Sequence, residues 1–194
     1  MSNKILVTGA AGFIGYHVTL KLLEQGEDVV GIDNMNAYYD VKLKETRVAI
    51  LNAKSNFKFY QIAIEDNTQL NNVFQQEGFD RVIHLAAQVG VRSPPCEFYR
   101  YVNSNLLGFS NVLDSCRINA IEHLLYASSS SVYGDMAVTP FKEQDIVDKP
   151  QSLYAASKRA NELMAYSYSY QYQIPTTGLR FFTVYGPWGR PDMA

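Results

Sequence analysis

Short apolar runs alternate along the chain with longer stretches in which apolar residues recur at helical spacing. The short runs are rich in Val, Ile or Leu and show little polar alternation, which is typical of strands buried on both faces of a parallel sheet. We expect such strands at residues 5–8, 28–32, 57–61, 81–84, 123–127 and 176–180. We expect helices at residues 13–25, 41–52, 68–76, 98–119 and 153–171.

This order of elements predicts an α/β fold, a doubly wound parallel sheet covered by helices and joined by right-handed crossovers. With 194 residues, the chain is long enough for one well-packed domain and short for two. No internal repeat and no linker rich in Gly or Ser divides it. We therefore expect residues 1–194 to form a single domain.

The end of the last predicted helix has an ambiguous pattern. Tyrosine occupies every second position from Tyr166 to Tyr172, which is strand periodicity, but the run directly continues a helical stretch. Pro175 then supplies a stop signal. We interpret the run as the end of the helix, with Tyr166 and Tyr170 on one face, and favour a buried or subunit-facing edge over a ligand site.

Composition narrows the class of protein. Hydrophobic residues make up 47% of the chain, charged residues 19%, and the net charge of −2 gives no footprint for nucleic acid or an anionic membrane. No apolar stretch approaches the length of a membrane span. Cys96 and Cys116 lack metal-ligand spacing, and no secretory signal is present. We expect a cytoplasmic protein with reduced thiols and no metal site.

A glycine-rich turn follows the first predicted strand. The chain reads Thr-Gly-Ala-Ala-Gly-Phe-Ile-Gly from Thr8 to Gly15. Glycines at this spacing permit a tight turn and the close approach of the backbone to a pyrophosphate. The helix that follows offers unpaired N–H groups and the positive end of its dipole. The turn predicts a nucleotide site on a Rossmann-type sheet.

An acidic residue, Asp33, directly follows the second predicted strand. A carboxylate there accepts hydrogen bonds from the ribose hydroxyls of the adenosine and repels a 2′-phosphate. No Arg or Lys lies between Gly26 and Val41 to bind that phosphate. The pattern favours NAD over NADP, although Asp33 as a simple turn former remains an alternative.

Tyr154 and Lys158 stand four residues apart on a predicted helix, which puts both on one face. A neighbouring ammonium and a positive nicotinamide both favour phenolate, so the pair suits a general base. The serine run from Ser128 to Ser131 follows the fifth predicted strand at its carboxyl end, where open α/β sheets bind ligands. The alternatives are a packed Tyr beside a surface Lys, and a polar loop.

With these motifs in this order, the sequence resembles the extended short-chain dehydrogenase/reductase family. Within it the likeness is to the NAD-dependent epimerase/dehydratase group, and most of all to the UDP-glucuronate 4-epimerases. It runs from the glycine turn through His-Leu-Ala-Ala-Gln at 84–88 to Arg-Phe-Phe-Thr-Val-Tyr-Gly-Pro-Trp-Gly-Arg at 180–190. The last block is the most specific, and it looks like the glucuronate rather than the galactose enzymes.

The resemblance assigns roles by position. It implies that Tyr154 is the catalytic base, Lys158 its electrostatic partner and Ser129 the catalytic hydroxyl, with Ser130 as a near alternative. The implied NAD site comprises Gly9, Gly12, Phe13, Ile14, Gly15, Asp33, Asn34, Ile64, Leu85, Ala86, Ala87, Gln88, Ser104, Tyr154, Lys158 and Phe182. The implied substrate contacts are Arg92, Ser129, Ser130, Thr183 and Arg190, with Arg190 as the partner of a uronate carboxylate.

The implied reaction is a transient oxidation of the sugar at carbon 4, followed by reduction from the other face. A dehydratase would need an acidic pair where Ser130 and Ser131 stand, and a decarboxylase would need Glu in place of Ser131. A UDP-galactose-type 4-epimerase and a dinucleotide-binding module without turnover remain as alternatives. The resemblance also implies a nucleotide-sugar substrate and pairing of two copies through the Tyr/Lys helix and its neighbour.

Three departures from the family pattern affect these expectations. Ala63 stands where the family commonly has the Asp that bonds the adenine amino group. Ser93-Pro94-Pro95 replaces the usual Tyr-Ser after Gly-Val-Arg. Family members also continue into a substrate-binding lobe, so we expect that lobe to be largely missing from this chain.

Overall fold

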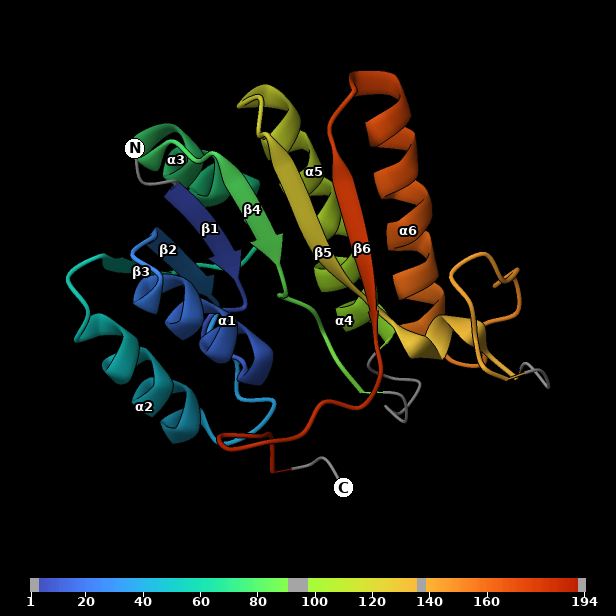
Figure 1. Ribbon diagram of the computed structural model, residues 1–194, viewed down its shortest axis with the longest axis horizontal. Coiled ribbons are helices and arrows are strands. Elements are labelled where there is room, and N and C mark those ends of the chain that lie inside the picture. Colours follow the sequence, from blue (N-terminus) through green and yellow to red (C-terminus); the bar gives the residue numbers. More distant parts are fainter. Residues whose placement is uncertain (1–3, 91–97, 136–138, 192–194) are drawn as a thin grey trace.

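Six parallel strands form one sheet in the order β3-β2-β1-β4-β5-β6 (Figure 1). The computed structural model describes residues 4–90, 98–135 and 139–191. Its strands are β1 (Lys4–Thr8), β2 (Asp28–Asp33), β3 (Phe57–Gln61), β4 (Arg81–His84), β5 (His123–Ser129) and β6 (Thr176–Phe181). The strand order reverses between β1 and β4, which leaves a crevice at their carboxyl ends. The predicted doubly wound fold is confirmed.

The helices connect consecutive strands. They are α1 (Phe13–Glu24), α2 (Val41–Asn52), α3 (Asn67–Glu77), α4 (Phe98–Tyr101), α5 (Phe109–Ile118) and α6 (Leu153–Tyr172). A π-helical segment, η2 (Val102–Gly108), joins α4 to α5, and a single 3₁₀ turn, η3 (Ser130–Tyr133), follows β5. The helix expected at 98–119 is therefore one continuous helical path with a π-helical middle.

Two hydrophobic clusters hold the layers together, one on each face of the sheet. Ile5 and Val7 of β1 point into the cluster under α1 and α2, whereas Leu6 points into the cluster under α3, α5 and α6. Side chains of a strand alternate between faces, so burial on both faces requires a continuous apolar run. This is why β1 and β2, which are buried along nearly their whole length, lack polar alternation.

The tyrosine-rich run is helical, as predicted. The helix α6 continues to Tyr172, and Gln173 ends it in the left-handed conformation with φ of 56°. Tyr166 and Tyr170 are 71% and 73% exposed, on an outer face of α6. Neither residue lines the cavity described below, so the ligand-site interpretation of this run receives no support from its position.

The structure also bears on the expected absence of a membrane span and on the two cysteines. Within the ranges that the structure describes, no helix is long and apolar enough to cross a membrane. Cys116 is a buried free thiol, whereas Cys96 lies outside the described residues.

Candidate active site

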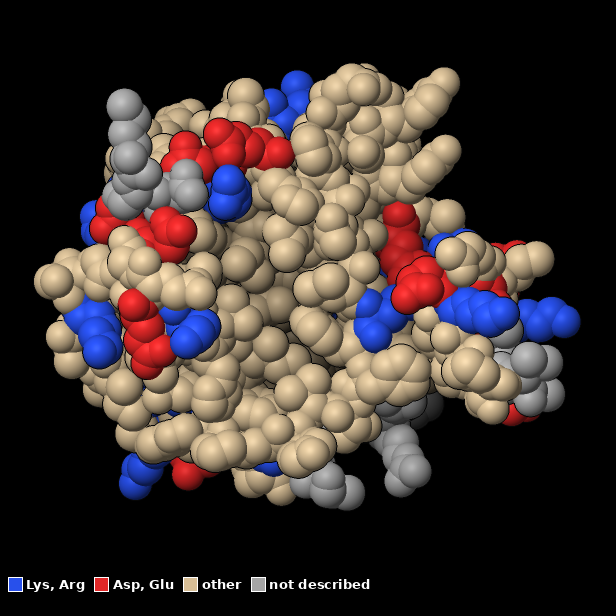
Figure 2. Space-filling view, viewed as in Figure 1, with Lys and Arg blue, Asp and Glu red and all other residues tan. Residues whose placement is uncertain are grey.

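A cavity of about 810 Å³ opens at the carboxyl ends of β1, β2, β4, β5 and β6. Figure 2 shows that this face of the molecule is hollowed and that few charged side chains border the hollow. Twenty of the twenty-one residues singled out in the sequence line the cavity. They are Gly9, Gly12, Phe13, Ile14, Gly15, Asp33, Asn34, Ile64, Leu85, Ala86, Ala87, Gln88, Ser104, Ser129, Ser130, Tyr154, Lys158, Phe182, Thr183 and Arg190. The remaining candidate, Arg92, lies outside the described residues.

The glycine turn forms the floor of the cavity. Gly9 has φ of +72°, and its N–H donates to the carbonyl oxygen of Ile32 on the neighbouring strand at 2.7 Å. A Cβ on Gly15 would stand 2.0 Å from the carbonyl oxygen of Gly9, so only glycine allows α1 to begin this close to β1. Gly12 precedes α1, and no side chain caps the helix. The first N–H groups of α1 are thus available to an anion.

Asp33 lies at the end of β2, beside the ammonium of Lys44. The carboxylate accepts a hydrogen bond from the N–H of Met35 at 2.9 Å, and Lys44 Nζ stands 3.8 Å from Asp33 Oδ1. Burial raises the pKa of Asp33, and the charge of Lys44 partly counters that shift. The carboxylate is therefore held in place at the edge of the cavity.

The sequence analysis missed the two cations that α2 brings to this region. The interval from Gly26 to Val41, which holds no Arg or Lys, stops short of Lys44 and Arg47, and both of these cations are buried. Lys44 lines the cavity, while Arg47 donates to the carbonyl oxygen of Ala11 in the glycine turn at 2.9 Å. The signal was available, because the inward positions 44, 47, 48 and 51 of α2 follow helical spacing.

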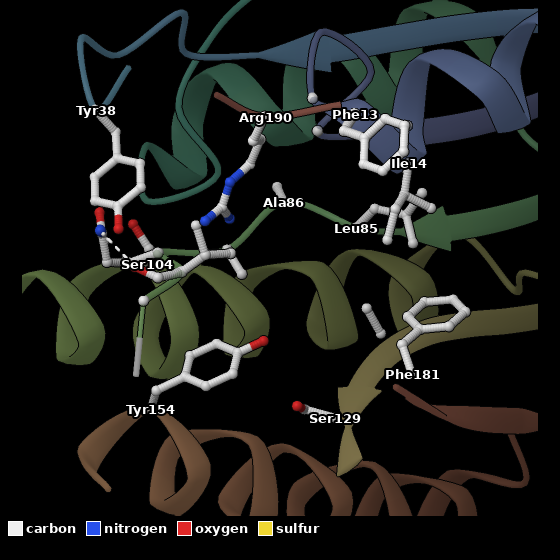
Figure 3. A pocket seen from close by; sticks show the side chains of 18 of the residues that line it. Phe13, Ile14, Tyr38, Leu85, Ala86, Ser104, Ser129, Tyr154, Phe181 and Arg190 are labelled. Carbon is white, nitrogen blue, oxygen red and sulfur yellow. Dashed lines mark hydrogen bonds between the residues drawn. The ribbon is translucent and has the colours of Figure 1, made fainter. Parts of the chain in front are cut away.

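Tyr154 and Ser129 face the same part of the cavity. Tyr154 is in the first turn of α6, which Ser152 caps by accepting from the N–H of Ala155 at 3.1 Å. Figure 3 shows the Tyr154 and Ser129 hydroxyls extending toward each other from α6 and β5. Burial raises the pKa of Tyr154, while a hydrogen bond with Ser129 and the charge of Arg190 act in the opposite direction.

Lys158 is 2% exposed, and its Nζ lies 5.9 Å from the centroid of the Tyr154 ring. Its ammonium donates to the carbonyl oxygen of Ala127 at 3.0 Å. Burial lowers the pKa of Lys158 to about 8. The sequence analysis expected this lysine to favour the phenolate form of Tyr154, but burial has the largest influence on the pKa of that tyrosine.

A buried amide, Asn105 in η2, ties the cavity wall to α6, and the sequence analysis missed it. The N–H of Gln88 donates to Asn105 Oδ1 at 2.8 Å, and Asn105 Nδ2 donates to Ser157 Oγ at 2.9 Å. Ser157 Oγ in turn donates to the carbonyl oxygen of Tyr154 at 2.8 Å. A π-helical segment is a frequent feature of functional sites, but helical periodicity does not reveal it in the sequence.

The segment after β6 returns across the molecule and carries Arg190 to the cavity. Arg47 donates to the carbonyl oxygen of Trp188 at 2.5 Å, and His17 Nε2 lies 2.8 Å from the carbonyl oxygen of Pro187. The Arg190 guanidinium lies 5.6 Å from the Tyr38 ring centroid. Figure 3 shows it reaching into the cavity from the side opposite Tyr154.

Phe182 lines the end of the cavity near Ser129. It stacks with Phe141 and Tyr133 at ring-centroid distances of 6.2 and 6.5 Å, although 60% of its surface is exposed. Thr183 follows it along the wall. This end of the cavity is therefore aromatic and open, whereas the end near Asp33 is lined by polar groups.

Comparison with known proteins gives one family. The model of the NAD-dependent epimerase/dehydratase family matches residues 5–194. The chain is 53% identical to protein CapI of Staphylococcus aureus and 49% identical to a probable UDP-glucuronate 4-epimerase of Rhizobium meliloti (strain 1021), each over 98% of this chain. The crystal structure of UDP-glucuronic acid 4-epimerase from Bacillus cereus, in complex with UDP-glucuronic acid and NAD, superimposes with a TM-score of 0.92 at 38% identity over 98% of this chain.

The chain spans 57% and 56% of the lengths of these two relatives, and 60% of the crystallised chain. The family match covers nearly the whole chain. This protein belongs to the NAD-dependent epimerase/dehydratase family.

Proposed function

We propose that this member of the family binds NAD in its cavity and epimerises a nucleotide sugar at carbon 4, with UDP-glucuronate as the substrate. The observation that carries the proposal is that Ser129, Tyr154 and Arg190 converge on the cavity that the glycine turn lines. In this proposal residues 1–194 serve as the dinucleotide-binding unit.

The shape of the cavity fits a dinucleotide. The missing Cβ atoms at Gly9 and Gly15 leave the backbone of the turn open, and the uncapped start of α1 offers N–H groups to a pyrophosphate. Asp33 lines the cavity, and in this proposal its carboxylate accepts hydrogen bonds from the ribose hydroxyls of the adenosine. The other end of the ligand then extends toward Tyr154 and Ser129.

Bound NAD would supply a hydride acceptor that is regenerated in each turnover. The Tyr154 oxygen, placed beside Ser129, takes the proton of the 4-hydroxyl and returns it after the keto sugar has presented its other face. Lys158 holds α6 to β5 through Ala127, so the distance between the two hydroxyls stays fixed. A positive nicotinamide nearby would favour the phenolate and offset the effect of burial.

Arg190 favours a uronate over a neutral hexose. Its guanidinium enters the cavity opposite Tyr154 and matches the geometry of a carboxylate. A UDP-galactose-type sugar has no carboxylate and gains little from such a cation. The galactose-type epimerase is therefore the second candidate.

We also propose that two copies of the chain pair through α5 and α6. Leu163, Tyr166 and Tyr170 on α6, and Ile118 at the end of α5, are each more than half exposed. Large apolar side chains grouped on an outer helical face are typical of protein interfaces.

Purified protein tests the proposal in two steps. Released nicotinamide dinucleotide is first identified by chromatography, and UDP-glucuronate is then added and the sugar product followed by NMR. We expect bound NAD and formation of the carbon-4 epimer. Tyr154→Phe should retain NAD and lower turnover at least about a hundredfold, whereas the exposed control Tyr185→Phe should match wild type. Bound NAD without conversion of any UDP-sugar would instead support a dinucleotide-binding module.

A further inference from the structure

Glu65 places a carboxylate with one unpaired oxygen at the polar end of the cavity. The hydroxyl of Ser104 donates to Glu65 Oε1. The second oxygen, Oε2, is buried and has no hydrogen-bond partner among the residues that the structure describes. Both Glu65 and Ser104 line the cavity. The carboxylate therefore retains an acceptor that its surroundings do not satisfy.

The backbone around Glu65 is fixed. The amide of Asn111 on α5 donates to the carbonyl oxygens of Ile64 at 3.0 Å and Glu65 at 3.2 Å. These bonds hold the turn between β3 and α3 against α5. The backbone of Glu65 is thus fixed, and the hydrogen bond from Ser104 orients its carboxylate.

An unpaired buried carboxylate oxygen is unfavourable, and a ligand donor would relieve the cost. The last torsion of a Glu side chain is broad, so the carboxyl group can rotate to exchange its two oxygens between Ser104 and the cavity. Ser104 can keep its bond to one oxygen while the other accepts from a ligand. The site thus favours a ligand group that donates and disfavours one that accepts.

The order of groups along the cavity identifies that donor. The glycine turn faces the pyrophosphate and Asp33 the adenosine ribose, so the base lies beyond Asp33, where Ile62, Ile64 and Glu65 line the wall. The ring nitrogens of adenine accept hydrogen bonds, and its exocyclic amino group is the donor on that edge. A carboxylate is complementary to the amino group alone.

Neighbouring residues do not offer this contact. Ala63 has no side-chain acceptor. The carboxylate of Asp66 is exposed and caps α3, accepting from the backbone N–H and the side-chain amide of Gln69 at 3.0 and 2.6 Å. Glu65 is the acid at the end of β3 that lines the cavity.

We propose that Glu65 accepts a hydrogen bond from the amino group of the adenine base and makes the protein selective for an amino-purine dinucleotide. This inference rests on the proposed NAD site. Glu65 thus supplies the acceptor that Ala63 lacks, two residues further along the chain. Its carboxylate is held by Ser104, and its backbone is supported by Asn111.

Dissociation constants for NAD and for deamino-NAD, in which an oxo group replaces the amino group, test the inference. They are measured by calorimetry after removal of copurified dinucleotide. Wild type should bind NAD at least about tenfold more tightly than deamino-NAD. Glu65→Met should bring the ratio close to one, mainly by weakening NAD. Glu45→Met removes the same charge from an exposed position on α2 and should keep the wild-type ratio.

The outcomes separate this inference from the proposed function. A protein that binds neither dinucleotide contradicts both. Equal binding of the two dinucleotides by wild type, or a ratio unchanged in Glu65→Met, overturns the role of Glu65 alone. If circular dichroism shows that Glu65→Met is unfolded, Glu65→Gln preserves the shape with a neutral acceptor. That variant should lower the ratio, and an unchanged ratio overturns the inference.

Discussion

The ammonium of Lys158 on α6 donates a hydrogen bond of 3.0 Å to the carbonyl oxygen of Ala127 on β5. Ser129 follows two residues later on the same strand, and Tyr154 lies one helical turn before Lys158. One bond thus joins the two elements that carry the facing hydroxyls. The lysine has a structural role in the site whether or not it acts on the phenol directly.

The buried ammonium of Lys158 predicts a pH dependence of stability. Burial lowers its pKa from 10.5 to about 8, so between these values the folded chain has released a proton that the unfolded chain still binds. Stability contributed by this group therefore rises with pH across that window, and below pH 8 the cost of the buried charge is fully present. Each unit of the shift corresponds to about 1.4 kcal/mol.

Urea unfolding between pH 7.5 and 10.5 measures this effect. The free energy of unfolding of wild type, relative to Lys158→Met, should increase as pH rises. The exposed control Lys54→Met should run parallel to wild type. Parallel curves for wild type and Lys158→Met would show that the buried lysine does not titrate in this window.

Replacement of Asp33 should change the choice of dinucleotide because of Lys44. Asp33→Ser removes the carboxylate that repels a 2′-phosphate and leaves the Lys44 ammonium, 3.8 Å from the former Oδ1, to bind it. We expect the ratio of NADP to NAD affinity to rise about tenfold or more. The double variant Asp33→Ser/Lys44→Met should lose most of that gain. Equal ratios in the single and double variants would rule out Lys44 as the phosphate partner.

The fold, the glycine turn and the Tyr154/Lys158 pair follow from short-range patterns in the sequence, whereas other cavity residues, such as Ser104 and Arg190, were assigned by resemblance to the family. Buried parallel strands read as apolar runs, and the glycine turn is encoded within eight residues, from Thr8 to Gly15. The four-residue spacing of Tyr154 and Lys158 likewise fixes their shared face. Each of these features depends on neighbours in the chain, so a single sequence was sufficient to predict its position.

The missed residues depend on contacts between distant elements. Asn105 functions through a π-helical segment that shifts it toward Gln88 and Ser157, and helical periodicity gives no sign of that shift. The backbone of Glu65 is held by a hydrogen bond from the side-chain amide of Asn111 on α5. The inward position of Arg47 on α2 follows helical spacing, but its bond to Trp188 joins residues 141 positions apart in the chain. No local pattern encodes these bonds.

The exposed aromatic face of α6 predicts a dimer, and positive charges introduced on this face should disrupt it. Tyr166→Lys/Tyr170→Lys places two ammonium groups per chain on the proposed interface, where they would be desolvated and close to their copies in the partner. We expect light scattering during size-exclusion chromatography to show a dimer for wild type and a monomer for this variant. Ile146→Lys/Tyr185→Lys adds the same charge at residues 78% and 91% exposed elsewhere and should remain dimeric. A monomeric wild type would refute the interface.

The final prediction separates a uronate epimerase from a neutral-sugar epimerase. Arg190 enters the cavity opposite Tyr154, and its charge favours the Tyr154 phenolate. Arg190→Ala would affect every substrate because the Tyr154 phenolate loses a favourable charge. A uronate would lose its ion pair with Arg190 as well. We expect kcat/KM for UDP-glucuronate to fall at least about tenfold more than kcat/KM for UDP-galactose. Arg81→Ala, an exposed change at the start of β4, should alter neither value. Equal losses on the two sugars would assign Arg190 to Tyr154 or to the dinucleotide, and would leave the preference for a uronate without a structural basis.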